Sequence, residues 1–305
     1  MNSCSLLIPC YNAEKYLPRL WETVKAQIVP FDEIICYDDG SNDNTASVAR
    51  SLGARVIRSD VSLGAAQARN QLSRASKYSW FHFHDADDLL QPEYLQKVKS
   101  RINNNVDVIL CNVDWIDAET RNLIISFKYI ENELKQNPVN YTLSHPIGGI
   151  NGLYRKEAFL SIGGFDESMK VWEDADLHVR LANAGAEFAV VEEVLAISLR
   201  HPSTTSHNYI VNWQSRFQAL KKYAYQLDSK FSQEISTQAE IAARSLLDLE
   251  DQKTAVESIK LCISLGGKPP KTNNLFFEAL KLFLPPLWLF QLQKFIRRRI
   301  VFRQL

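Results

Sequence analysis

The residues with the clearest chemical potential form one short acidic string, His84-Asp85-Ala86-Asp87-Asp88, which follows an apolar run. Three carboxylates at the end of a strand offer the hard oxygen ligands that Mg²⁺ and Mn²⁺ prefer. Such ions commonly bind through one or two carboxylates together with substrate phosphates. The alternative is an acidic turn that caps the helix following it. Taken alone, the string leaves both interpretations open.

Two histidines next to the acidic string suggest a rival chemistry. His82 and His84 have the His-x-His spacing of zinc ligands at a strand end, which would suit a metal-dependent hydrolase. The string is similar to the HxHxDH motif of metallo-β-lactamase-like hydrolases. It departs from that motif because Ala86 stands where the motif needs Asp, and Asp87 where it needs its last His. The other interpretation packs both histidines inside a sheet.

Polar side chains also follow the first two apolar runs of the chain. Tyr11 and Asn12 come after the first run, and Asp39 ends the second. A carboxylate can accept hydrogen bonds from a base or a ribose, and an aromatic ring such as Tyr11 can stack on a base. Each turn alone is common, but the two together predict a polar pocket.

Two further candidates lie on expected helices. Arg69 belongs to the helix expected at 64–75, where a guanidinium suits a phosphate or a carboxylate, although taken in isolation it is better explained as a solvated surface arginine. In the helix expected at 173–184, Asp174 shares one face with Leu177, so its carboxylate should point inward. The simpler explanation for Asp174 is an acidic residue at a helix start, which the helix dipole favours.

The elements that must position these residues are those of an α/β fold. The expected strands are 5–10, 33–37, 55–58, 80–84 and 107–113, and the expected helices between them are 13–27, 45–52, 64–75 and 92–103. Near-continuous apolar strands spaced by helices are typical of a doubly wound, mostly parallel sheet. Ligands bind outside the carboxyl ends of such strands, where the polar strings fall. No GxGxxG follows the first strand, which argues against a dinucleotide site of the usual kind.

The rest of the chain divides by pattern. Glycines at 148–164 predict tight loops beside a cleft, and a last strand is expected at 188–199. From about residue 207 the pattern becomes helical, with helices expected at 209–227, 232–249 and 254–265. We therefore predict a first domain at 1–206 and a helical C-terminal region at 207–305.

Charge and cysteine content limit the classes of function. The chain has 35 Lys or Arg and 35 Asp or Glu residues, so it lacks the basic balance of a general nucleic-acid binder. Its five cysteines form no CxxC pair, and no leader or membrane span is evident, which predicts a cytoplasmic protein.

The C-terminal tail is the exception to this neutrality. The apolar segment 275–290 is followed by Arg297-Arg298-Arg299. One interpretation packs this tail on the acidic remainder of the chain. The other is peripheral contact with an anionic membrane, at its inner face.

In their order and spacing, the polar strings together resemble family 2 glycosyltransferases of the GT-A fold, over about residues 3–202. The resemblance extends to Arg200-His201, which is similar to an arginine-histidine stretch that often closes the domain in this family. It departs at Ser62, where many members have Asn before the glycine, and this puts one nucleotide contact in doubt.

The resemblance implies a set of roles for named residues. The nucleotide-binding residues that it implies are Pro9, Tyr11, Asn12, Asp39, Arg69 and Asp85. The implied ligands of Mn²⁺ or Mg²⁺ are Asp85, Asp87, Asp88 and His201. Asp174 is the implied catalytic base, with Glu173 beside it.

The implied reaction transfers a hexosyl group from a nucleotide-sugar, UDP-linked, to a hydroxyl of a saccharide or lipid-linked acceptor, with inversion at the anomeric carbon. Such a reaction serves polysaccharide or glycoconjugate synthesis. A sugar nucleotidyltransferase is an alternative, but it would need a glycine-rich basic loop after the first strand, and Pro9-Cys10-Tyr11-Asn12 has no glycine. A non-catalytic binding protein is a further alternative, and it would have no need to keep every acidic residue.

Overall fold

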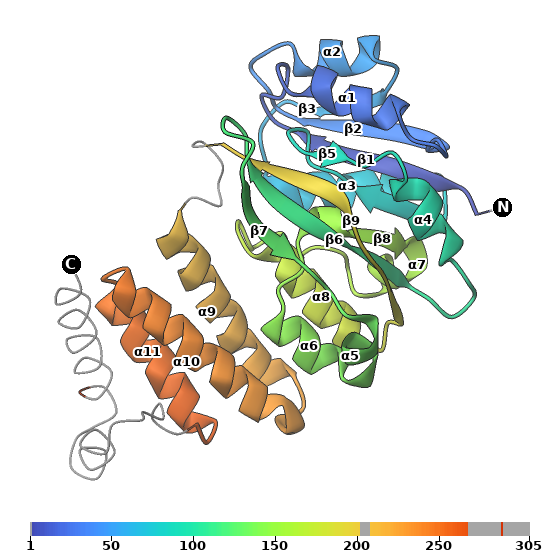
Figure 1. Cartoon of the computed structure of the whole chain (residues 1–305). Coiled ribbons are helices and arrows are strands. Elements are labelled where there is room, and N and C mark those ends of the chain that lie inside the picture. Colours follow the sequence, from blue (N-terminus) through green and yellow to red (C-terminus); the bar gives the residue numbers. More distant parts are fainter. Residues whose placement is uncertain (1, 202–207, 268–287, 289–305) are drawn as a thin grey trace. The chain divides into compact units, whose positions relative to one another are not determined.

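The computed structural model describes residues 2–201, 208–267 and 288. The chain divides into two compact units, Met1–Thr204 and Thr205–Leu305. The first unit holds a large sheet with helices around it, and the second holds long helices (Figure 1). The predicted α/β class with a helical C-terminal part is confirmed.

In the part of the chain that the structure describes, nine strands form one sheet of order β3-β2-β1-β4-β8-β6-β9-β5, with β7 paired to β6. The strands are β1 Cys4–Cys10, β2 Glu33–Asp39, β3 Arg55–Ser59, β4 Trp80–Phe83, β5 Leu89–Leu90, β6 Val108–Asp117, β7 Leu123–Phe127, β8 Gly152–Arg155 and β9 Phe188–Arg200. The helices of the first unit are α1 Leu17–Lys25, α2 Thr45–Ser51, α3 Ala65–Ala75, α4 Tyr94–Ser100, α5 Glu131–Gln136, α6 Pro138–Ser144, α7 Lys156–Ser161 and α8 Glu173–Asn183.

The first half of the sheet has the predicted parallel arrangement. β1 pairs in parallel with β2 and with β4, and β2 pairs in parallel with β3. The register places Cys10 opposite Asp38, so these two strands end at the same edge. The polar residues that follow β1, β2 and β4 therefore gather along one edge, as ligand-binding residues do in open α/β sheets.

The second half departs from a simple doubly wound sheet. β8 lies antiparallel between β4 and β6, while β6 and β9 are parallel to each other. The strands β5, β7 and β8 were not predicted: β5 has only two residues, and β8 lies in the glycine-rich stretch where loops were expected.

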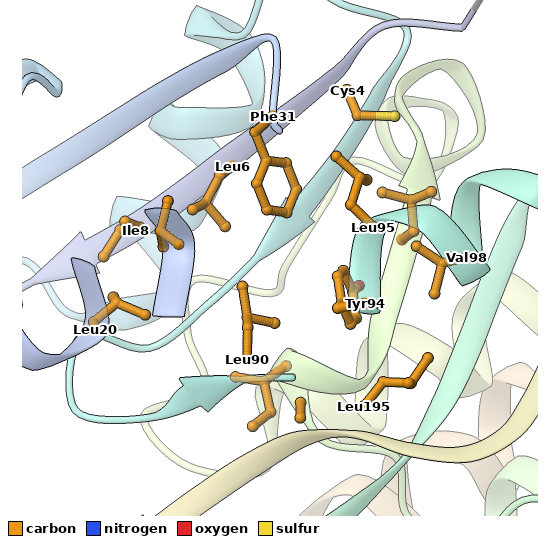
Figure 2. Close-up of a cluster of buried hydrophobic side chains, with 14 of the residues drawn as sticks. Cys4, Leu6, Ile8, Leu20, Phe31, Leu90, Tyr94, Leu95, Val98 and Leu195 are labelled. Carbon is orange, nitrogen blue, oxygen red and sulfur yellow. The ribbon is translucent and has the colours of Figure 1, made fainter. Parts of the chain in front are cut away.

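A hydrophobic cluster secures β1 against two helices (Figure 2). Leu6 and Ile8 occupy alternate positions of β1 and so point to the same face, where they pack with Leu20 of α1 and Leu95 of α4. All four side chains are fully buried, which stabilises the fold by about 1.5–3 kcal/mol for each. The cluster holds rigidly the strand whose carboxyl end carries the first polar string.

In the described part of the second unit the long helices are α9 Tyr209–Gln226, α10 Ser232–Asp248 and α11 Gln252–Ser264, close to the predicted bounds. Its core includes Leu246 and Ile259. The side chain of Asp251 caps α11 by accepting a hydrogen bond from the backbone N–H of Thr254, 3.1 Å away.

The predicted domain boundary at residue 206 and most of the apolar and basic tail lie outside the described residues, and their roles stay predictions. Within the described ranges, the structure has no helix with the length and hydropathy needed to cross a bilayer.

Candidate active site

Asp39 organises the loop that follows β3. Its carboxylate accepts hydrogen bonds from the backbone N–H groups of Leu63 and Gly64, at 3.0 and 2.8 Å, and from the hydroxyl of Ser62 at 2.8 Å. The carboxylate is therefore buried against this loop at the carboxyl end of β2. Ser62, the residue that departs from the family pattern, contacts the predicted nucleotide-binding carboxylate directly.

The turn after β1 lies beside the turn after β2. Asn12 has a left-handed backbone with φ 49°. Its N–H donates to the Ser41 hydroxyl at 2.9 Å, and its side-chain oxygen accepts from the N–H of Asn42 at 3.0 Å. Tyr11 is 54% exposed, so its ring is accessible to a ligand, while Pro9 lies within β1. The structure thus brings the predicted nucleotide-binding residues of these two turns together.

The three aspartates of the acidic loop have different partners. Asp85 forms an ion pair with Arg69 of α3, with 2.7 Å between Oδ1 and Nη2. Asp88 is turned into the protein, where Oδ1 accepts a hydrogen bond from the backbone N–H of Leu199 at 2.8 Å. Asp87 is half-buried between them. The side chains of Asp85 and Asp87 are thus partly exposed, while that of Asp88 is buried and bound to β9.

The three carboxylates of the loop repel one another, and Arg69 and Arg200 oppose that repulsion. Burial raises the pKa of Asp87 and of Asp88, and the neighbouring carboxylates raise both further. Burial acts in the same direction on Asp85, but Arg69 outweighs it and holds the pKa of Asp85 below its usual range. A bound cation would relieve the remaining repulsion.

The carboxylate oxygens of the acidic loop decide which kind of metal could bind there. Across the described residues, no cluster of three or more His, Cys, Asp or Glu side chains is arranged to hold a metal by itself. His201 lies at the end of β9, with its ring 5.4 Å from that of Tyr16. Oxygen ligands from Asp85 and Asp87 suit Mg²⁺ or Mn²⁺ when substrate phosphates complete the shell. The residues therefore fit a metal that binds together with a phosphorylated ligand.

The two histidines before the loop form an internal pair, and the zinc-hydrolase interpretation is wrong. Both rings are fully buried, and His82 Nε2 lies 3.1 Å from His84 Nδ1. His82 Nδ1 lies 2.9 Å from the Gly152 carbonyl oxygen and 2.7 Å from the Tyr94 hydroxyl. Burial lowers the pKa of His84 to about 4, so this ring is neutral near pH 7. Three of the four ring nitrogens have partners inside the protein, and both rings are buried, so the pair does not form an open metal site.

Arg69 joins the acidic loop to α8. Besides Asp85, its guanidinium binds Glu173, with 2.8 Å between Nη1 and Oε1. The side chain is 7% exposed, so the solvated-arginine explanation is wrong. Burial would lower the pKa of Arg69, but Asp85 and Glu173 outweigh this and raise it. A permanent cation is thus held between two predicted site carboxylates.

Asp174 lies at the start of α8 and touches the glycine loop before β8. Its Oδ2 accepts from the N–H of Gly149 at 3.2 Å, and its Oδ1 accepts from the N–H of Ala175 at 2.8 Å. Its own carbonyl oxygen lies 2.7 Å from Nδ1 of the buried His178. Trp172, just before the helix, has a left-handed backbone with φ 77°. Strained residues of this kind cluster at functional sites.

Glu173 and Asp174, adjacent at the start of α8, differ in the partners of their carboxylates. Burial raises the pKa of Asp174, an effect that Arg69 partly opposes. Burial and the Asp174 charge raise the pKa of Glu173 to about 7, again against Arg69. Glu173 is bound to the Arg69 guanidinium, whereas the carboxylate of Asp174 accepts hydrogen bonds from the backbone N–H groups of Gly149 and Ala175.

Sequence reasoning missed two supporting residues. The Asn70 side chain makes two hydrogen bonds of 2.9 Å with the backbone of Phe165, one through each end of its amide. The Trp115 ring lies under the guanidinium of Arg200, 3.3 Å from ring centre to guanidinium carbon. Both partners are distant along the chain, so no local pattern could have identified them.

Comparison with known proteins adds an independent line of evidence. The glycosyl transferase family 2 profile matches residues 5–163, and a profile described as the N-terminal domain of galactosyltransferase matches residues 130–208. A protein of Haemophilus influenzae named an uncharacterized glycosyltransferase is 30% identical over 182 residues, which are 58% of this chain and 61% of that protein. The minor teichoic acid biosynthesis protein GgaA of Bacillus subtilis is 30% identical over 62% of this chain and 45% of its own length.

Solved structures show the same fold at low identity. The mannosyltransferase PcManGT from Pyrobaculum calidifontis, solved with GDP-Man and Mn²⁺, superposes with a TM-score of 0.62 at 16% identity, over 98% of this chain and 86% of that one. S. aureus TarS 1-349 in complex with UDP-GlcNAc has a TM-score of 0.58 at 15% identity, over 86% and 90% of the two chains. These likenesses concern the fold, which is the predicted GT-A fold. With the family profile covering more than half of its length, the chain belongs to glycosyl transferase family 2.

Proposed function

We propose that the protein transfers a sugar from a nucleoside diphosphate sugar, UDP-linked, to an acceptor hydroxyl with inversion at the anomeric carbon. The observation that carries this proposal is the continuous contact from Asp85 through Arg69 to Glu173, next to Asp174. In this proposal the network connects Asp85, on the phosphate-binding side, with the start of α8, which carries the base.

The donor would lie along the ends of β1, β2 and β4. In this proposal Pro9, Tyr11, Asn12 and Asp39 receive the nucleoside. Asp85 and Asp87 would hold Mn²⁺ or Mg²⁺ with the diphosphate, and the metal would neutralise charge on the leaving group. His201 is proposed to reach the same diphosphate. Asp88 contributes by fixing the loop to β9.

Asp174 would act as the general base. As the acceptor oxygen bonds to the anomeric carbon, the bond from that carbon to the diphosphate oxygen breaks, and the acceptor proton passes to a carboxylate oxygen of Asp174. The reacting carbon gains oxocarbenium character, as in glycoside hydrolysis. Attack from the face opposite the leaving group inverts the configuration.

The names of two relatives support a place in polysaccharide or glycoconjugate synthesis. GgaA is a teichoic acid biosynthesis protein, and ExoU of Rhizobium meliloti, 29% identical over 52% of this chain, is a succinoglycan biosynthesis protein. By analogy, the acceptor is proposed to be a saccharide or a lipid-linked saccharide on the cytoplasmic side of the membrane.

Replacing Arg297, Arg298 and Arg299 with alanine should reduce sedimentation with anionic liposomes if the tail contacts the membrane.

The sugar nucleotidyltransferase alternative has no supporting observation, since the turn after β1 lacks a glycine-rich basic loop.

A screen of UDP- and GDP-sugars for Mn²⁺-dependent hydrolysis by the full chain tests the proposal. We expect one nucleotide class to be hydrolysed, and Asp87→Ala to abolish metal-dependent binding in calorimetry. Asp248→Ala, an exposed change on α10, is the matched control. Activity that is indifferent to metal in both proteins would contradict the metal assignment.

A further inference from the structure

The end of β9 is held by two hydrogen bonds, one to the acidic loop and one to the turn that follows β6. Leu199 donates its backbone N–H to Asp88, and the next residue, Arg200, accepts a hydrogen bond at its carbonyl oxygen from the N–H of Ala118, 3.1 Å away. Arg200 therefore follows directly on a residue that is hydrogen-bonded to the loop. Burial lowers the pKa of the Arg200 guanidinium, and the charges of the loop aspartates oppose that change.

The direction of the Arg200 side chain is decided by β6. Trp115 pairs with Ser198 across the parallel ladder, so Arg200, two residues on, lies on the same face as the indole. The guanidinium carbon is 3.3 Å from the ring centroid. Phe127 of β7 contacts the same indole, with ring centroids 4.8 Å apart. The guanidinium thus lies on an aromatic surface that is itself held by a second ring.

We propose, on the basis of the function proposed above, that Trp115 is a positioning residue for donor binding: its indole holds the Arg200 guanidinium beside the acidic loop, where the guanidinium meets the diphosphate. A planar guanidinium stacks on an aromatic face and presents several N–H donors to phosphate oxygens, which a lysine cannot do in the same way. Because the Arg200 guanidinium is already held in place before the donor binds, donor binding costs less side-chain rotamer entropy. The role requires a planar cation at 200 and an aromatic ring at 115.

The test measures the affinity of the full chain for UDP and GDP with Mn²⁺, and for the corresponding nucleosides, by calorimetry and competition. Trp115→Ala should weaken binding of the preferred nucleoside diphosphate about tenfold, the range of a partly desolvated cation–π contact, and leave nucleoside binding unchanged. Trp115→Phe should recover most of the loss. In an Arg200→Ala background, Trp115→Ala should have no further effect on the diphosphate.

Ile116→Ala is the matched control, because Ile116 is the next residue of β6 and points to the opposite face. It should lower thermal stability without changing the ratio of nucleoside to diphosphate affinity. Equal weakening of nucleoside and diphosphate by Trp115→Ala, or additive effects of the two alanine changes, would overturn the inference alone. Absence of any nucleoside diphosphate binding by the unaltered protein would overturn both the inference and the proposed function.

Discussion

Arg69 and Asp85 form an ion pair of 2.7 Å in which the guanidinium is almost fully buried while the carboxylate reaches the edge of the sheet. The second arm of the same guanidinium binds Glu173, which lies 104 residues further along the chain. Arg69 therefore ties the loop after β4 to the start of α8. The spacing between the proposed metal-holding and base residues depends on it.

The first prediction concerns this cation. Arg69→Ala removes the counter-charge of the largely buried Glu173 and of the partly exposed Asp85, so the free energy of unfolding should fall by about 3 kcal/mol. Arg69→Lys restores the charge but cannot bind both carboxylates in the same way, so its loss should be intermediate. Urea denaturation measures both. Arg74→Ala, on the exposed side of the same helix, should change the stability by less than about 0.5 kcal/mol. Equal stabilities of the Arg69 and Arg74 variants would contradict the role of Arg69.

The second prediction concerns the base. Asp174→Asn preserves shape but removes the proton acceptor, so the rate of transfer should fall by about 10²–10⁴. The donor dissociation constant should hardly change, because Asp174 lies on the acceptor side in the proposed mechanism. Steady-state kinetics and calorimetry separate the two effects, with exposed Glu157→Gln on α7 as the control. Near-normal transfer by Asp174→Asn would move the role to Glu173.

The third prediction concerns pH and Glu173. Its pKa is raised from an ordinary 4.5 to about 7, so between these values the folded protein binds a proton that the unfolded chain has released. The contribution of Glu173 to stability is therefore largest at low pH and is lost as pH rises from about 4.5 to 7. Relative to Glu173→Gln, the unaltered protein should be more stable at pH 5 than at pH 8. Denaturation curves of both proteins at the two pH values give this difference, and an opposite sign would show that the Arg69 pair controls the ionisation of Glu173.

The fourth prediction separates backbone strain from steric overlap at two adjacent glycines. Both have positive φ, 80° at Gly163 and 74° at Gly164. A Cβ at Gly163 would meet no atom within 4 Å, whereas one at Gly164 would lie 2.4 Å from Oδ1 of Asn70.

Gly163→Ala should therefore cost only the strain of a left-handed backbone, about 1 kcal/mol. Gly164→Ala should cost about 1–3 kcal/mol more, because it also displaces the amide that binds Phe165. Thermal and urea unfolding of the two variants give the comparison. Equal losses would mean that the Asn70 side chain moves aside at no cost.

Local pattern in the sequence determined much of this molecule. Near-continuous apolar runs identified β1, β2, β3, β4 and β9, and helical periodicity identified the three helices of the second unit to within a few residues. The positions of the polar strings at strand ends followed from the same pattern, because an apolar run stops where the chain leaves the core. The inward direction of Asp174 followed from its spacing to Leu177, which is fully buried.

Tertiary structure alone decided which of these polar groups meet. Asp88 binds a backbone group 111 residues away, and Arg69 binds Glu173 across 104 residues. It also decided that β8 enters antiparallel and that His82 and His84 bind each other inside the sheet. The physical reason is that periodicity records whether a side chain is buried, which is a local property. The partner that satisfies a buried charge or donor is set by long-range packing of the strands.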